Sequence, residues 1–128
     1  MALDYGAART GVAVSDATGT LARPVGVVER AASTSGLRQV AELVAAEGAE
    51  RVVVGLPLTL RGEAGAQAEE TAAFVAALEA LLDVPVESFD ERFTTALAAS
   101  GPSSNAPEDA RAAAHLLENW LAWTSREG

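Results

Sequence analysis

The first part of the chain alternates short apolar segments with turn residues, which is typical of a meander of β-strands. Strands are predicted at Ala2–Asp4, at Arg9–Asp16 (RTGVAVSD) and at Pro24–Glu29 (PVGVVE). A turn at Thr18-Gly19-Thr20 separates the second strand from the third. Because closely spaced strands joined by glycine-containing turns usually pair with each other, we expect three antiparallel strands here.

After this meander the apolar residues recur at helical spacing. Ser33 or Ser35 can cap a first helix, which Gly48 ends. Residues Glu63–Leu82 predict a second helix, and its apolar stripe is the strongest periodic signal in the chain. The stripe consists of Thr71, Phe74, Val75, Leu78, Leu81 and Leu82.

Two further apolar segments predict a fourth strand at Arg51–Leu56 and a fifth at Val84–Phe89. A short helix is predicted near Thr94. Asn105-Ala106-Pro107-Glu108 has the form of a capping box, which opens a last helix running to about Trp123. The predicted order is therefore β-β-β-α-β-α-β-α-α.

This order predicts an α/β fold with one five-stranded mixed sheet, three strands antiparallel and then two added in parallel, flanked by helices. A length of 128 residues with 49% apolar residues fits a single domain over residues 1–128. No stretch reaches the roughly 20 apolar residues of a membrane span. With no signal-like segment at Met1 and no cysteine, we expect a cytoplasmic protein.

Acidic residues from distant parts of the chain converge in this topology. The first, fourth and fifth strands run parallel, so Asp4 and the pair Asp90 and Glu91 follow strand ends at one sheet edge. Asp109 lies in the first turn of the last helix, where it begins an apolar stripe. A charge in that position is costly unless it is paired or bound to a cation. Residues Ala113, Leu116 and Trp120 continue the stripe.

Carboxylates gathered in this way either raise one another's pKa or bind metal. Mg²⁺ prefers a few carboxylates together with water and phosphate oxygens, and two such ions can promote hydrolysis of a phosphodiester. Each residue also has a simpler interpretation. Asp4 could form an Asx turn, Asp90 and Glu91 a solvated loop beside Arg92, and Asp109 could complement the helix dipole.

The charge balance is unusual for a protein that binds nucleic acid. Eighteen acidic residues face nine basic ones, all arginine, and the formal net charge is −9. Since phosphate contacts supply most non-specific affinity, binding would require clustered arginines or bound divalent cations. His115 stands without cysteine or a second histidine, which excludes a zinc site of that kind.

Four segments in succession resemble the motifs of the YqgF (RuvX) family, relatives of the RuvC resolvases within the ribonuclease H-like superfamily. They are LDYGAARTGVAVSD, VVVGLPLTLRGEAGAQAEET, DERFTT and DARAAAHLLENWL. The resemblance implies a ribonuclease H-like fold and a nuclease dependent on Mg²⁺ or Mn²⁺, acting in 5′-end maturation of pre-16S rRNA. It also implies catalytic roles for Asp4, Asp90, Glu91 and Asp109. We favour Asp4, Asp90 and Asp109 as metal ligands, with Glu91 as a further ligand or an aid to water.

One segment departs from the family pattern. Members usually carry a Lys/Arg-rich stretch before the last acidic residue, whereas the corresponding stretch here, residues 99–105, is short and uncharged. We therefore expect the phosphate contacts to structured RNA or branched DNA to come from Arg9, Arg30, Arg61 and Arg92.

Two alternatives remain open besides the rRNA nuclease. A Holliday junction resolvase would need a homodimer that presents two sites to a symmetric substrate. A non-catalytic ribonuclease H-like module for ribosome assembly would fit the acidic charge and the short stretch. An actin-like phosphotransferase shares the Asp-Tyr-Gly opening, but the chain is too short for a second lobe.

Overall fold

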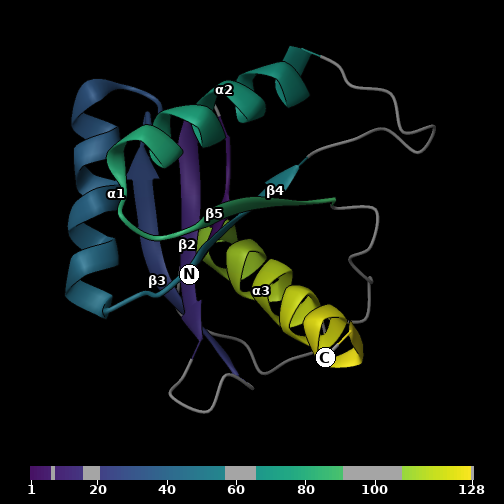
Figure 1. Cartoon of the computed structure of the whole chain (residues 1–128). Helices are drawn as coiled ribbons and strands as arrows, with labels where there is room; N and C mark the ends of the chain where they lie inside the picture. Colours follow the sequence, from purple (N-terminus) through teal and green to yellow (C-terminus); the bar gives the residue numbers. More distant parts are fainter. Residues whose placement is uncertain (7, 16–20, 57–65, 91–107, 128) are drawn as a thin grey trace.

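The computed structural model describes residues 1–6, 8–15, 21–56, 66–90 and 108–127 (Figure 1). Its elements are β1 (Ala2–Asp4), β2 (Arg9–Ser15), β3 (Ala22–Glu29), α1 (Thr34–Glu47), β4 (Val52–Leu56), α2 (Ala66–Leu81), β5 (Val86–Asp90) and α3 (Glu108–Glu127).

The strands form one sheet in the order β3-β2-β1-β4-β5. β1, β2 and β3 pair antiparallel, whereas β4 pairs parallel with both β1 and β5. The predicted mixed sheet is therefore confirmed. Because β1, β4 and β5 run in the same direction, their C-terminal ends share one edge with the start of β2 and the end of β3. We call this the carboxyl edge.

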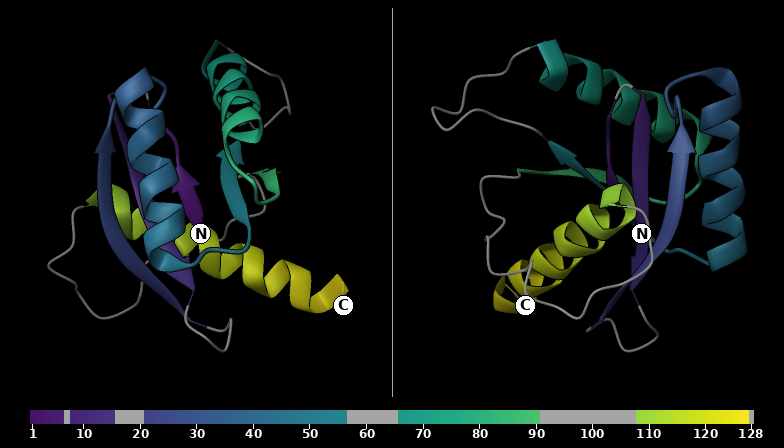
Figure 2. Two further views of the ribbon diagram at one scale, coloured as in Figure 1. Left: turned by 60° about the vertical axis from the view of Figure 1, so that its left-hand side comes forward. Right: turned by 180° about the vertical axis from the view of Figure 1, so that it is seen from behind.

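Helices cover both faces of the sheet (Figures 1 and 2). Since side chains alternate between the faces of a strand, each strand contributes to two cores. One face packs against α1 and α2 through Leu3, Val12, Val54, Val40, Val44, Phe74 and Leu78. The other packs against α3 through Ala2, Ala13, Val53, Phe89, Ala113, Leu116 and Leu117.

The ends of α1 follow the sequence prediction. The Ser33 side chain accepts a hydrogen bond of 3.0 Å from Gly36 N, so Ser33 rather than Ser35 is the N-cap. Gly48 ends the helix in a left-handed conformation with φ 64°, which a residue without Cβ adopts at little cost.

Two tryptophans fix the C-terminal half of α3 beside β5. Trp120 Nε1 donates to Glu87 Oε1 at 2.9 Å, and the Arg51 guanidinium lies 5.6 Å from the centre of the Trp120 ring. Trp123 meets Phe89 edge to face at 6.3 Å. These contacts position the helix along its length, so that its first turn reaches the carboxyl edge.

Several predicted boundaries were wrong. β3 begins at Ala22 rather than Pro24, because an edge strand tolerates proline, and the register shift in its partner strand lies at Val12/Ala13. β5 covers Val86–Asp90 instead of Val84–Phe89. α3 extends past Trp123 to Glu127.

The predicted stripe of α2 was wrong at one residue. Thr71, Phe74 and Leu78 are buried, whereas Leu81 is 50% exposed at the end of the helix. The helix predicted near Thr94, and the capping residues 105–107, lie outside the described residues. Within the described part of the chain, no helix combines the length and apolar character that crossing a membrane requires.

Candidate active site

Asp4 ends β1 at the carboxyl edge, on the side of the sheet that faces α3. Its backbone pairs with Gly11 of β2, as Ala2 pairs with Ala13. Ala2 and Ala13 are both buried against α3, and alternate residues of a strand share a face. Asp4 therefore points to the α3 side, where it is half-buried.

Gly11 is the point at which α3 meets the sheet backbone. A Cβ added to Gly11 would overlap the carbonyl carbon and oxygen of Asp109 and would lie 2.9 Å from Ala110 N. Only glycine permits such an approach. Paired residues in an antiparallel ladder have their Cα atoms about 4.5–5.5 Å apart. The pairing of Asp4 with Gly11 thus brings Asp4 and Asp109 to neighbouring positions at one end of the sheet.

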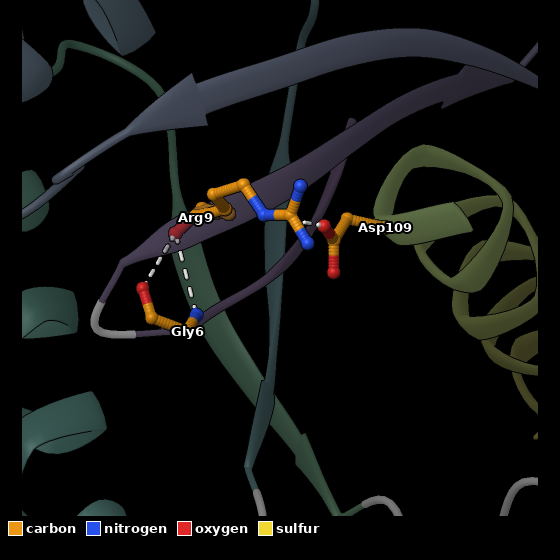
Figure 3. Close-up of polar contacts among 4 residues, drawn as sticks. Gly6, Arg9 and Asp109 are labelled. Atoms are coloured by element: carbon orange, nitrogen blue, oxygen red, sulfur yellow. Dashed lines mark hydrogen bonds and ion pairs between the residues drawn. The ribbon is translucent and has the colours of Figure 1, made fainter. Parts of the chain in front are cut away.

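Arg9 forms an ion pair with one of these two acids, Asp109. Arg9 Nε lies 3.2 Å from Asp109 Oδ2, and Figure 3 shows the guanidinium reaching from β2 to the first turn of α3. The Arg9 side chain is 65% exposed and that of Asp109 is 33% exposed. Sequence reasoning assigned Arg9 to phosphate contacts and Asp109 to metal, and it missed the contact between them.

The turn that follows Asp4 is tied to β2 by Thr10, which is fully buried. The Thr10 hydroxyl accepts from Gly6 N and donates to Gly6 O, both at 3.4 Å. On the same face as Thr10, Tyr5 stacks on Phe74 of α2, with ring centres 4.6 Å apart. Asp4 therefore precedes a segment that is anchored on the α1/α2 face of the sheet, opposite to the face on which Asp4 lies.

Tyr5 carries a pKa shift with a clear cause. Burial of the phenol raises the pKa of Tyr5 above its ordinary value, and the nearby Glu70 carboxylate raises it further. Both effects disfavour the phenolate. The side chain next to Asp4 in sequence is therefore a neutral, packed residue over the physiological range.

Arg30 lies at the same edge, just after β3. Its N–H donates to Ala8 O at 3.0 Å, which joins the end of β3 to the turn between β1 and β2. The Arg30 carbonyl accepts from Ser33 N at 2.9 Å and from Ser33 Oγ at 2.6 Å. Arg30 is exposed and has φ 48°, in the left-handed region.

The structure describes some of the other predicted site residues only in part. Asp90 is the last residue of β5, and its backbone pairs with Leu56 at the carboxyl edge. Glu91, Arg61, Arg92 and the stretch 99–105 lie outside the described residues. Among the residues that are described, no group of three or more His, Asp or Glu side chains is close enough to hold a metal ion.

Comparisons with known proteins place this arrangement in a family. The model of the RuvX family of Holliday junction resolvases matches residues 1–123. A relative from Chloroflexus aggregans is 48% identical over 98 residues, which cover 77% of this chain and 69% of the relative. One from Rhodococcus jostii is 40% identical over 137 aligned positions, covering 97% of this chain and 77% of the relative. Both bear the provisional name of pre-16S rRNA nuclease.

A solved structure shares the fold at low sequence identity. The structure of Thermus thermophilus RuvC in complex with a Holliday junction substrate aligns with a TM-score of 0.67 and 19% identity. The alignment covers 98% of this chain and 93% of that one, which confirms the predicted ribonuclease H-like architecture. Together with the family match and the relatives, it confirms the resemblance seen in the sequence: this chain belongs to the RuvX family.

Proposed function

We propose that this protein is a nuclease dependent on divalent metal that hydrolyses phosphodiester bonds during 5′-end maturation of pre-16S rRNA. The observation that carries the proposal is that the backbones of Asp4 and Asp109 both lie against Gly11, at the carboxyl edge. The names of the relatives support rRNA as the substrate.

The residues at this edge suit a hard divalent cation. Asp4 and Asp109 supply oxygen ligands of the kind that Mg²⁺ and Mn²⁺ prefer. The Asp109 carboxylate already pairs with a positive group, the Arg9 guanidinium, which supports its proposed role as a ligand of a metal cation. We assign the remaining carboxylate to Asp90, which ends β5 on the same edge, with Glu91 as a further ligand or an aid to water.

When bound, the ions would lower the pKa of an attacking water and stabilise the leaving oxygen of the phosphodiester. The chain's own residues would orient the substrate. Arg9 and Arg30 lie at the same edge as the acids and are exposed, so they can contact phosphates on either side of the cleaved bond. We assign Arg61 and Arg92 the same role.

A second candidate function is the resolution of Holliday junctions. The description of the family and the fold shared with a junction-bound RuvC favour it. A resolvase acts on two strands that are related by symmetry, so this function would require a homodimer with two sites.

The deciding experiment offers the protein two labelled substrates, a pre-16S rRNA precursor and a four-way DNA junction, with Mg²⁺ or Mn²⁺. We expect RNA cleavage that falls roughly 100-fold or more in Asp4→Asn and Asp109→Asn, as loss of a metal ligand requires. Glu47→Gln is the matched control, because Glu47 is also an ion-paired acid but lies in α1.

Each other outcome has a distinct meaning. Cleavage at the full rate in Asp109→Asn would defeat the proposed site. Cleavage of the junction alone, by a dimer, would establish the resolvase. If the wild-type protein cleaves neither substrate, the non-catalytic module is favoured instead.

A further inference from the structure

We propose that Arg9 occupies the cation position at Asp109 in the metal-free protein and that the divalent ion displaces it. Arg9 and the metal would then compete for one carboxylate. This inference rests on the proposed function, since it assumes that Asp109 is a metal ligand. It adds a role for Arg9 that neither the family match nor the predicted phosphate contact contains.

The ion pair joins a fixed acid to a movable base. Asp109 belongs to the first turn of α3, which is held against Gly11 without room for even a Cβ. Arg9 lies two residues before Gly11 in β2 and therefore on the same face of the strand. Its side chain is 65% exposed. The guanidinium can therefore leave for solvent by rotation of its own side chain, whereas the backbone of Asp109 is held in place against Gly11.

The relative strengths of the two interactions favour displacement. An exposed ion pair contributes little, because water screens it and holding a long side chain costs entropy. A divalent ion carries twice the charge and engages several carboxylates at once. The released guanidinium stays at the carboxyl edge, near Arg30, where it can bind a substrate phosphate.

Competition predicts opposite effects on two affinities when Arg9 is removed. We expect Arg9→Gln to bind Mn²⁺ about two- to fivefold more tightly in calorimetric titration of the metal-free protein. In cleavage assays, the KM for RNA at saturating Mn²⁺ should rise, whereas the Mn²⁺ concentration that gives half the maximal rate at saturating RNA should fall. A residue with a merely structural role would not move these two quantities in opposite directions.

Two arginines provide matched controls with the same change of charge. Arg23 also forms an ion pair, from Nη2 to Glu47 Oε1 at 2.8 Å, and the two side chains are 62% and 26% exposed. Arg30 lies at the carboxyl edge, with its backbone bonded to Ala8. We expect Arg23→Gln and Arg30→Gln to leave the Mn²⁺ affinity nearly unchanged.

Three results would overturn the inference, and they are distinguishable. Unchanged Mn²⁺ affinity in Arg9→Gln, beside normal metal binding by the wild type, would refute competition alone. Equal tightening in Arg30→Gln would show a long-range field in place of competition. If the wild type does not bind Mn²⁺, or if Asp109→Asn binds it as tightly as the wild type does, the metal site of the proposed function fails as well.

Discussion

At the scale of single residues, the backbone of Arg30 is strained at a position where its side chain is exposed. A left-handed conformation costs a residue with a Cβ about 1–2 kcal/mol. Hydrogen bonds to Ala8 and Ser33 hold Arg30 at φ 48° nonetheless. Glycine would adopt this conformation without strain. The presence of arginine is consistent with the phosphate contact that we propose for it.

The substitution Arg30→Gly should separate stability from binding. We expect the free energy of unfolding to rise by up to about 1 kcal/mol, because relief of strain exceeds the added chain entropy. The affinity for RNA should fall. Urea denaturation and RNA titration measure the two effects.

Gly48→Ala is the control, since Gly48 has φ 64° and no neighbour that a Cβ would meet. It should lower the free energy of unfolding by about 1 kcal/mol and leave RNA binding intact. A loss of stability in Arg30→Gly would contradict the interpretation of strain.

Tyr5 gives a prediction for alkaline pH that can be observed directly, because it is the single tyrosine of the chain. Burial and then Glu70 raise the pKa of Tyr5 above 10.0, so the folded state holds the phenol proton more tightly than the unfolded chain does. Its contribution to stability is complete below about pH 10 and is lost as the pH rises through the folded pKa.

We expect the phenolate absorbance to appear at higher pH in the native protein than in urea. Glu70→Gln should lower the native midpoint, and Tyr5→Phe should weaken the loss of stability at alkaline pH. Identical midpoints in the native protein and in urea would exclude both causes of the shift.

At the scale of elements, the docking of α3 on β2 determines where Asp109 lies. Gly11→Ala would force the first turn of the helix away from the strand, and Asp109 would move with it. We expect strongly reduced cleavage and Mn²⁺ affinity, with far-UV circular dichroism close to that of the wild type.

Gly26→Ala is the matched control, because Gly26 lies in the neighbouring strand, pairs with Val12 and has nothing within 4 Å of an added Cβ. It should retain both cleavage and metal affinity. Equal activity of the two variants would show that the contact at Gly11 does not set the position of Asp109.

The arrangement of the elements was largely predictable from the sequence, whereas one contact of the site was not. The strand order follows from apolar periodicity and short connections, because these constrain which strands become neighbours. The carboxyl edge carrying Asp4 and Asp90 follows from the same order. The ion pair between Arg9 and Asp109 does not, because it depends on the depth at which α3 docks. A glycine inside a strand pattern, here Gly11, was the one local signal of that close approach.

At the scale of the whole molecule, the net charge of −9 opposes the binding of nucleic acid. The alignment with the Rhodococcus relative spans 137 positions, more than the 128 residues of this chain. The relative therefore has residues within the matched region that this chain lacks, in keeping with the short stretch seen in the sequence. We therefore expect the protein to make few phosphate contacts, and its binding of RNA to depend strongly on divalent cations.

We expect RNA affinity to fall sharply when EDTA removes divalent ions. Four arginines contacting phosphates would give a slope of log affinity against log salt no steeper than about −3 for single-stranded RNA. Titrations at several concentrations of monovalent salt, with divalent ions held constant, measure this slope. A much steeper dependence would show that other basic groups carry the binding.

The docking of α3 against Gly11 has a consequence for the timing of activity. A ribosome makes the chain from its N-terminus, so Asp4 and Gly11 emerge early, and Asp109 emerges after every strand of the sheet. The two carboxylates cannot meet while the chain is still short of α3. A nascent chain would thus lack nuclease activity toward the RNA of the ribosome that produces it. Activity would begin only once α3 has been synthesised.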